Sequence, residues 1–311
     1  MRFRTSAVGK KFARRLADKD FRVYITGSNS KMLASEVVST LGGRFVVRDV
    51  MPLSFGEFLR FKDFEVDRNI RYSPQLPKFK RLVTEFFYYG SFPESVNLPQ
   101  QDKKEYLSNL FMKVFYGDIL ARYKVQNQFA LRFLLKKLAE NLHDEVSFNR
   151  IKNLLVSSGL KIGINTVIDY LEYLQASYLI YPVENYVYKL ADRQSKRKYY
   201  FVDNGLLNLF LVNPETKLLE NIVFLLLKRR YGEVYYLRGK SEADFFVPNE
   251  AIVQVVYRLE QANIKRELKA FAEFENLCPH CRKILITFDK TGVNPDLPQD
   301  VEFEDLIDIV F

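Results

Sequence analysis

The sequence contains no tryptophan, two cysteines and two histidines among 311 residues. Two cysteines are too few for the disulfide framework that stabilises small secreted domains. No apolar run approaches the roughly 18 residues that a membrane-spanning helix requires. The first residues also lack the apolar stretch and the small-residue cleavage site of a secretory signal peptide. These absences exclude the secreted, disulfide-rich and membrane-spanning classes, and we expect a cytoplasmic protein with no membrane partner.

The two cysteines stand together as Cys278-Pro279-His280-Cys281. A structural zinc site needs four ligands, usually from two such pairs, and the only other histidine, His143, is distant in sequence. We therefore expect no metal here, and we interpret the motif as a reduced thiol pair in a turn just ahead of a strand.

Apolar and charged residues are both plentiful. The 27 phenylalanines and 19 tyrosines can fill a substantial core, and a charged fraction of 27% is typical of a globular protein. The length predicts two or three domains. The net charge of +9 favours an anionic partner, nucleic acid first, but specifies no site.

Residues 1–62 alternate between helical and β-rich patterns. The β-rich runs cover residues 21–26 and 44–50, with a helix expected between them and another helix beginning at Leu53. This alternation is typical of a parallel α/β sheet. Two strands are too few to stand alone, so we interpret the region as part of a larger sheet.

The middle region, residues 63–190, is mostly helical in pattern. Ser147 opens a helix that Gly159 breaks, and a second helix starts at Ile164 or Asn165. Strand-like runs follow, the first at residues 178–183. Helix, glycine-bearing turn, helix and β-hairpin is the layout of a winged helix-turn-helix.

The last region, residues 191–311, predicts a separate α/β domain with its own sheet. A strong helix covers residues 218–230, and the expected strands are 198–202, 233–237, 243–247, 251–257 and 283–288. The run Lys196-Arg197-Lys198, which follows the polar stretch from Asp192 to Ser195, is expected to be a loop at its entrance.

A phosphate-binding loop requires Gly-x-x-x-x-Gly-Lys-Ser/Thr between a strand and a helix. Gly239-Lys240-Ser241 ends correctly, but Val234 stands at the first glycine position and a strand follows. Near the N-terminus, Arg4 precedes Gly9-Lys10 in the same way. An apolar run ending in two acidic residues is also absent from the first 60 residues. ATP hydrolysis by this chain is therefore not predicted.

Several ordered motifs resemble prokaryotic AAA-type ATP-binding proteins and the C-terminal domain of unknown function that they share. These motifs lie at residues 23–33, 41–44, 52–59, 90–94, 200–206, 219–223 and 242–245. The resemblance covers nearly the whole chain. It implies an α/β, multi-domain fold: the remnant of a P-loop AAA-type parallel sheet, a helical and winged-helix middle, and a C-terminal restriction-endonuclease-like domain.

The resemblance also implies a role for the end of the first β-rich run, residues 21–26, and for the residues after it. Thr26, Ser28 and Asn29 correspond to a nucleotide sensor, and Arg44 to an arginine facing phosphate. Full-length family members bind ATP and Mg²⁺ through a phosphate loop that precedes this point. Without that loop we expect no cofactor for this chain alone, and Ser28 or Asn29 is then interpreted as a helix N-cap.

Nucleases of the restriction-endonuclease-like fold hold Mg²⁺ with carboxylates and use a lysine to orient the attacking water. The resemblance places Glu220, Asp244 and Gln254 at the carboxylate positions and Val256 at the lysine position. A neutral amide is a poor magnesium ligand, and valine cannot orient water. We therefore expect a degenerate nuclease fold retained for binding, and nuclease activity remains only as a third hypothesis.

The winged helix supplies the alternative function, nucleic-acid binding. Its second helix would present Lys161, Asn165 and Thr166 to DNA. The basic run Lys196, Arg197 and Lys198 could also contact phosphates, whereas Asp169 on the second helix of the winged helix would repel them. The leading hypothesis is a family member that is inactive alone and acts as a binding or assembly module, through a protein partner or self-association.

Overall fold

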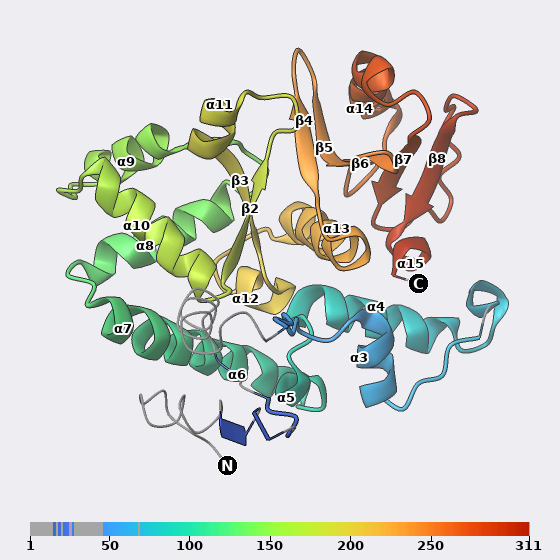
Figure 1. Ribbon diagram of the computed structural model, residues 1–311. Helices are drawn as coiled ribbons and strands as arrows, with labels where there is room; N and C mark the ends of the chain where they lie inside the picture. The colour runs from blue at the N-terminus through green and yellow to red at the C-terminus, as the bar shows by residue number, and fades with distance from the viewer. Residues whose placement is uncertain are drawn as a thin grey trace.

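The computed structural model describes residues 15–16, 18–19, 21–24, 27, 46–67 and 69–310. Two sheets with surrounding helices make up this part of the chain, a mixed α/β architecture (Figure 1). None of its helices combines the length and the apolarity that a membrane crossing requires.

The two β-rich runs near the N-terminus do not form strands where the structure describes them. Residues 21–24 and 46–50 have no regular secondary structure. A strand is defined by backbone hydrogen bonds to a neighbour, and neither segment pairs with another described segment. The prediction of a parallel sheet in this region is therefore wrong for these residues, and the rest of it lies outside the described residues.

Helices connect this region to the first sheet. Helix α3 (Phe55–Phe61) is capped by Ser54. The Ser54 side chain accepts a hydrogen bond from the Glu57 N–H, and the Glu57 carboxylate accepts one from the Ser54 N–H. The following helical elements are η1 (Ile70–Tyr72), α4 (Leu76–Tyr89), α5 (Pro93–Val96), α6 (Gln100–Met112), the π-helical segment η2 (Lys113–Leu120) and α7 (Ala121–Tyr123).

The first sheet follows the predicted order of helices and strands. Its elements are α8 (Gln128–Glu140), β1 (Val146–Ser147), α9 (Phe148–Ser157), α10 (Ile164–Ala176), β2 (Ile180–Glu184), α11 (Leu190–Ser195) and β3 (Lys196–Phe201). The three antiparallel strands lie in the order β1-β3-β2, with Val183 opposite Lys198. The run expected to be a loop, residues 196–198, is instead the start of β3, because it pairs with β1 and β2, and the polar stretch before it belongs to the short helix α11.

The second sheet has five strands in the order β4-β5-β6-β7-β8. Its elements are α12 (Asn204–Asn208), α13 (Glu215–Tyr231), β4 (Tyr235–Arg238), β5 (Glu242–Val247), β6 (Ala251–Val255), α14 (Gln261–Phe274), η3 (Glu275–Leu277), β7 (Arg282–Thr287), β8 (Val301–Asp305) and α15 (Leu306–Ile309). Strands β4 to β6 are antiparallel, whereas β6 to β8 are parallel.

Alternating side chains on this sheet serve two layers of core. Phe245 points into the large core beside α13, and Phe246 points into a smaller core beneath α14. Figure 1 shows α13 and α14 on opposite faces of the sheet. The large core is continuous from Phe55 to Val310, so the helical layer, the first sheet and one face of the second sheet bury their apolar surface together. The boundary predicted at residues 190/191 falls between two paired strands of one sheet.

Candidate functional site

Two of the motifs that carry the family resemblance meet at a buried carboxylate. Asp203 is 2% exposed and accepts hydrogen bonds from the backbone N–H groups of Ser91, Gly205 and Leu206 at 2.8, 2.7 and 3.2 Å. Burial raises the pKa of Asp203 to about 6, although the three donors act to lower it. This carboxylate therefore joins the segment after α4 to the start of α12.

A second buried network joins α13 to the first sheet. Asn221 accepts a hydrogen bond from the Phe201 N–H at 2.7 Å and donates to the Phe201 carbonyl at 3.1 Å and to Asn204 Oδ1 at 2.9 Å. Asn204 in turn donates to the carbonyls of Phe87 and Leu218. Every partner is a backbone group or another amide, so these motif residues hold the fold together.

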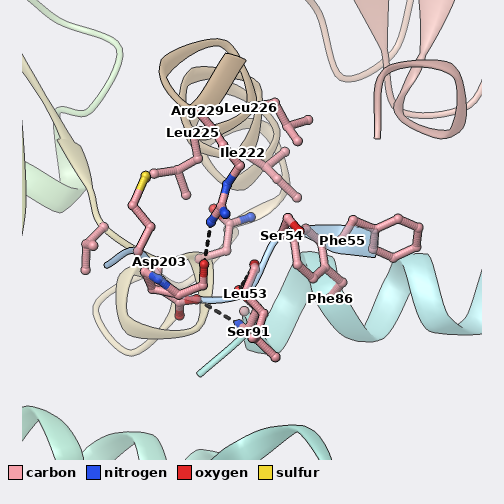
Figure 2. Close-up of a pocket in the computed structure, with 15 residues that line it drawn as sticks. Leu53, Ser54, Phe55, Phe86, Ser91, Asp203, Ile222, Leu225, Leu226 and Arg229 are labelled. Carbon is pink, nitrogen blue, oxygen red and sulfur yellow. Dashed lines mark hydrogen bonds between the residues drawn. The ribbon is translucent and has the colours of Figure 1, made fainter. Parts of the chain in front are cut away.

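A small pocket lies between these motifs, lined by α3, α4 and α13 (Figure 2). Arg229 closes one side by donating to the Pro52 carbonyl. The space inside is about 30 Å³, enough for a water molecule or two and far below the size of a nucleotide.

The predicted nuclease positions come together in the structure. Glu220 on α13 and Asp244 on β5 both face the ammonium group of Lys198, at 3.8 and 3.9 Å. Glu242 lies closer, 2.6 Å from the same nitrogen. The sequence argument identified neither Glu242 nor the role of Lys198 in this cluster, although Glu242 lies in the motif at residues 242–245.

The side-chain oxygen of Gln254 is not directed at the Lys198 ammonium. Its Oε1 accepts the Asp244 N–H at 2.8 Å, and its Nε2 donates to Glu267 at 3.1 Å. The Asp244 carboxylate itself accepts the Val255 N–H at 2.8 Å. Val256 is buried in the smaller core beneath α14 and touches none of these groups. The amide therefore braces β5 against β6 and α14.

The charges in the cluster shift one another's pKa values. Burial would raise the pKa of Glu220, but Lys198 and the contacting His143 lower it to about 2. Burial and the Glu220 charge raise the pKa of Asp244 to about 7. Burial lowers the pKa of Lys198, yet the three carboxylates more than reverse this, and the net shift is upward. Lys198 is therefore an ammonium ion throughout the physiological pH range.

These residues do not fit a magnesium ion. A divalent cation needs about six oxygen ligands at 2.0–2.6 Å, and Lys198 Nζ already lies among the three carboxylates. Among the residues that the structure describes, no three histidine, cysteine, aspartate or glutamate side chains are placed to hold a metal.

Lys198 was also predicted to contact nucleic acid, and that prediction is wrong. Its side chain is 0% exposed because β3 directs it into the acidic cluster. Arg197 donates to Glu184 at 2.9 Å and to the Arg193 carbonyl. Lys196 remains partly exposed and pairs with Asp192 at 3.0 Å. Of the three predicted basic contacts, Lys198 is removed from the surface altogether, and Lys196 and Arg197 are engaged in ion pairs.

The other predicted nucleic-acid contacts lie on helix α10 and in the turn just before it, which holds Lys161. Lys161 and Asn165 are exposed, and Thr166 is half-buried. Asp169 is exposed on the same helix, as the sequence predicted. These side chains remain candidates that no geometry here contradicts.

The connection between β2 and β3, residues 185–195, does not project into solvent as a free loop. Asn185 is fully buried, donates to the Arg238 carbonyl at 3.2 Å and accepts the Arg238 N–H at 3.3 Å. Tyr186 donates its N–H to the Tyr236 carbonyl, and its ring packs edge-on against Tyr235 and Phe246. This connection therefore joins the first sheet to β4 of the second.

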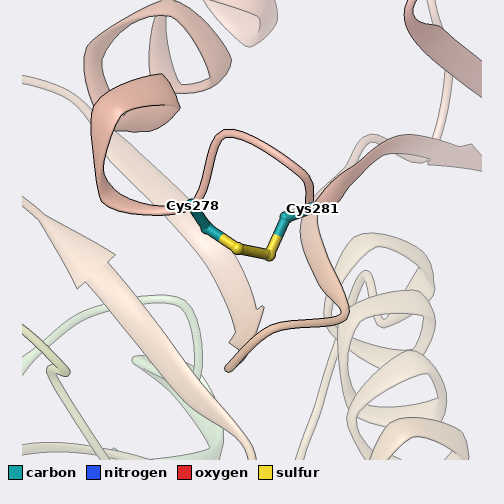
Figure 3. Close-up of a disulfide and its surroundings, with 2 residues drawn as sticks. All are labelled: Cys278 and Cys281. Carbon is teal, nitrogen blue, oxygen red and sulfur yellow. A yellow bond between two sulfur atoms is a disulfide. The ribbon is translucent and has the colours of Figure 1, made fainter.

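The cysteine pair is a disulfide between Cys278 and Cys281, with a sulfur–sulfur distance of 2.04 Å (Figure 3). The expectation of reduced thiols is wrong, whereas the expected turn ahead of a strand is present, since β7 begins at Arg282. A three-residue separation in a turn brings the two sulfur atoms within bonding distance.

The proposed nucleotide sensor cannot be placed. Thr26, Ser28, Asn29 and Arg44 lie outside the described residues.

Comparisons with known proteins relate both parts of the chain to described families. Residues 8–59 match a family model described as an AAA domain, and residues 80–217 match one described as a domain of unknown function (DUF8612). The first match supports a relationship to AAA proteins. The second includes helix α10 and the Asp203 network, whereas Asn221 and Leu218 of the other network lie just beyond the matched residues.

Two curated proteins are similar to most of the chain. An uncharacterized protein of Methanocaldococcus jannaschii is 36% identical over 272 residues, which is 84% of this chain and 61% of that protein. An uncharacterized protein of Haemophilus influenzae is 32% identical over 228 residues, 72% of this chain and 55% of that protein. The chain thus spans between half and two thirds of the length of these relatives.

Proposed function

We propose that this chain is a binding and assembly module related to AAA proteins, and that by itself it neither hydrolyses ATP nor cleaves nucleic acid. The printed sequence offers no phosphate loop in the segment that matches the AAA model. At the nuclease-like positions, a lysine ammonium stands among the carboxylates. Both observations favour binding over catalysis.

The observation that carries the proposal is the exposure of apolar side chains within the AAA-like segment. Tyr24 is 85% exposed, Val46 77% and Val50 95%. All three lie on β-rich segments that have no strand neighbour among the described residues. Exposed β-rich segments pair readily with another chain, and clustered apolar exposure marks interaction sites. A second copy of this chain would supply such a partner.

Self-association independent of nucleotide is the expected result. We expect multi-angle light scattering to show a concentration-dependent dimer with the same midpoint in the presence and absence of Mg-ATP. The double variant Val46→Lys/Val50→Lys should weaken the dimer by roughly tenfold or more, about 1.4 kcal/mol, because two ammonium groups would have to be desolvated. The matched control is Val212→Lys, since Val212 is 87% exposed outside these segments. A monomer at all concentrations, or assembly that requires Mg-ATP, would contradict the proposal.

Nucleic-acid binding is the second candidate, favoured by the order of elements from α8 to β3. A three-helix, three-stranded unit with an exposed second helix of the pair α9–α10 is the arrangement of winged-helix DNA-binding domains. In support, Lys161 in the turn before α10 and Asn165 at the start of α10 are both exposed, and the net charge is +9.

Binding through α10 predicts a steep dependence on salt. A footprint of about five phosphates would give a slope near −4.5 in a plot of log K against log salt concentration. Lys161→Glu should weaken duplex binding in a mobility-shift assay and flatten that slope. Lys269→Glu makes the same charge change at an exposed position on α14 and should have little effect. Equal losses in the two variants, or no shift of labelled duplex at 50 mM salt, would remove this candidate.

A further inference from the structure

The Lys198 ammonium lies among three carboxylates, of which Glu220 is buried whereas Glu242 and Asp244 are partly exposed. Lys198 extends from β3 of the first sheet, whereas Glu220 comes from α13 and Glu242 and Asp244 from β5. The ammonium group lies 2.6 Å from Glu242, 3.8 Å from Glu220 and 3.9 Å from Asp244. Its fourth side faces the ring of Tyr236, 5.4 Å from the ring centre.

The neighbours of the cluster fix the carboxylates in place. Tyr200 donates to Glu220 Oε1 at 2.6 Å, and His143 contacts the other oxygen of the same carboxylate. The Val255 N–H holds Asp244. Glu220 and Asp244 therefore keep their positions through groups other than Lys198, and Glu242 also lies 3.4 Å from the Arg238 guanidinium.

Burial explains why this site requires a cation. Glu220 is 3% exposed and Lys198 is 0% exposed. Buried carboxylates without a compensating positive charge are strongly destabilising. The Lys198 Nζ atom is also buried without a well-aligned hydrogen bond, although Glu242 lies 2.6 Å away. The ammonium is thus held by charge rather than by directed hydrogen bonds, as a bound ion would be.

We propose that the Lys198 ammonium is the resident cation of the Glu220–Glu242–Asp244 cluster, that it occupies the place of a divalent ion, and that removing it opens a divalent-cation site. A divalent ion cannot share the cluster with Lys198, because two cations within about 4 Å in a buried site repel strongly. In the absence of the lysine the carboxylate oxygens, now 2.6–3.9 Å from Nζ, need to close in by at most roughly 1–2 Å to reach coordination distance. Such a site would take oxygen-seeking divalent ions, with Mn²⁺ as the convenient probe.

The same lysine has a second consequence for the fold. It is the positive charge through which β3 of the first sheet is held to α13 and β5 of the second. A divalent ion bound by the carboxylates alone would neutralise the cluster but would not replace the ionic link from Lys198, leaving β3 held to α13 by the hydrogen bonds of Tyr200 and Phe201. The inference concerns these residues only and does not depend on the proposed binding role.

The test compares unfolding temperature and Mn²⁺ binding in the full chain and its variants. For the unaltered chain we expect 5 mM MnCl₂ to move the unfolding midpoint by less than about 1 °C relative to EDTA. Lys198→Met keeps the length of the side chain and removes its charge. We expect it to lower the midpoint by roughly 10 °C in EDTA, since one partner of a buried charge cluster is lost, and to regain several degrees with MnCl₂. Electron paramagnetic resonance should then count one bound Mn²⁺ per chain.

Matched variants separate this inference from a general loss of stability. Lys196→Ala, two residues away on the same strand and partly exposed, should respond to Mn²⁺ as the unaltered chain does. Lys198→Met/Asp244→Asn should lose the bound Mn²⁺. If Lys198→Met is unstable, it can be prepared throughout in MnCl₂, and recovery of folded protein only in that buffer supports the inference. Mn²⁺ binding by the unaltered chain that Asp244→Asn abolishes would overturn it, as would a Lys198→Met variant indifferent to Mn²⁺.

Discussion

Gly90→Ala is expected to destabilise the protein by about 3 kcal/mol or more. Gly90 ends α4 with φ 67° and ψ −152°, a region of backbone conformation that is essentially restricted to glycine. A β-carbon there would lie 2.1 Å from both carboxylate oxygens of Asp203. The strain of the backbone and the loss of the Asp203 hydrogen bonds to Ser91 and Gly205 add to each other.

Urea unfolding followed by circular dichroism measures this effect. Gly56→Ala is the matched control, because Gly56 lies in helix α3 with open space around the position of a β-carbon. Alanine favours a helix over glycine, so this control should be neutral or stabilising by up to about 1 kcal/mol. Similar midpoints for the two variants would show that Asp203 is not confined as the structure indicates.

Asn221→Ala is expected to cost about 3–5 kcal/mol. Asn221 is fully buried and satisfies both the N–H and the carbonyl of Phe201 as well as Asn204 Oδ1. Alanine would leave these groups without partners, and each buried polar group left unsatisfied costs about 1–3 kcal/mol. The same urea titration measures the loss.

Two further variants sharpen the test of Asn221. Asn153→Ala removes an exposed amide on α9 and should change stability by less than about 0.5 kcal/mol. Asn221→Asp keeps an acceptor for the Phe201 N–H but removes the donor and introduces a buried charge, so it should not restore stability. Wild-type stability in Asn221→Asp would show that only the acceptor matters.

The long amphipathic helices and the apolar strands could be predicted from the sequence. Helix α13 was expected at residues 218–230 and lies at Glu215–Tyr231. The strand expected at residues 243–247 is β5, one residue longer. Such segments carry their own periodicity, and tertiary packing only adjusts their ends.

Shorter elements were missed because their stability comes from neighbours. Strand β1 has two residues and exists only by pairing with Lys196 and Arg197. Strand β8 mixes Val301 and Phe303 with acidic residues at a sheet edge, and its pairing with β7 defines it. The loop predicted at residues 196–198 begins β3 instead, and the polar residues before it belong to helix α11, where Arg193 donates to the Tyr186 and Tyr188 carbonyls.

The candidate site was predictable in part. The family resemblance pointed to Glu220, Asp244 and Gln254, and the structure brings the first two to one ammonium group. The identity of that cation was out of reach, because Lys198 belongs to a run of basic residues that normally stays in solvent. The pairing of β3 with β2 turns this side chain inward, whereas Lys196 and Arg197 of the same basic run remain partly exposed.

Asn185 and Tyr186 couple the two sheets at the tip where a hairpin would ordinarily swing freely. A ligand bound by α10 would thus be held at a fixed angle to β4 and β5, with no flexible hinge between the two sheets. The geometry of one surface dictates that of the other. Whatever docks on both at once must match their spacing beforehand.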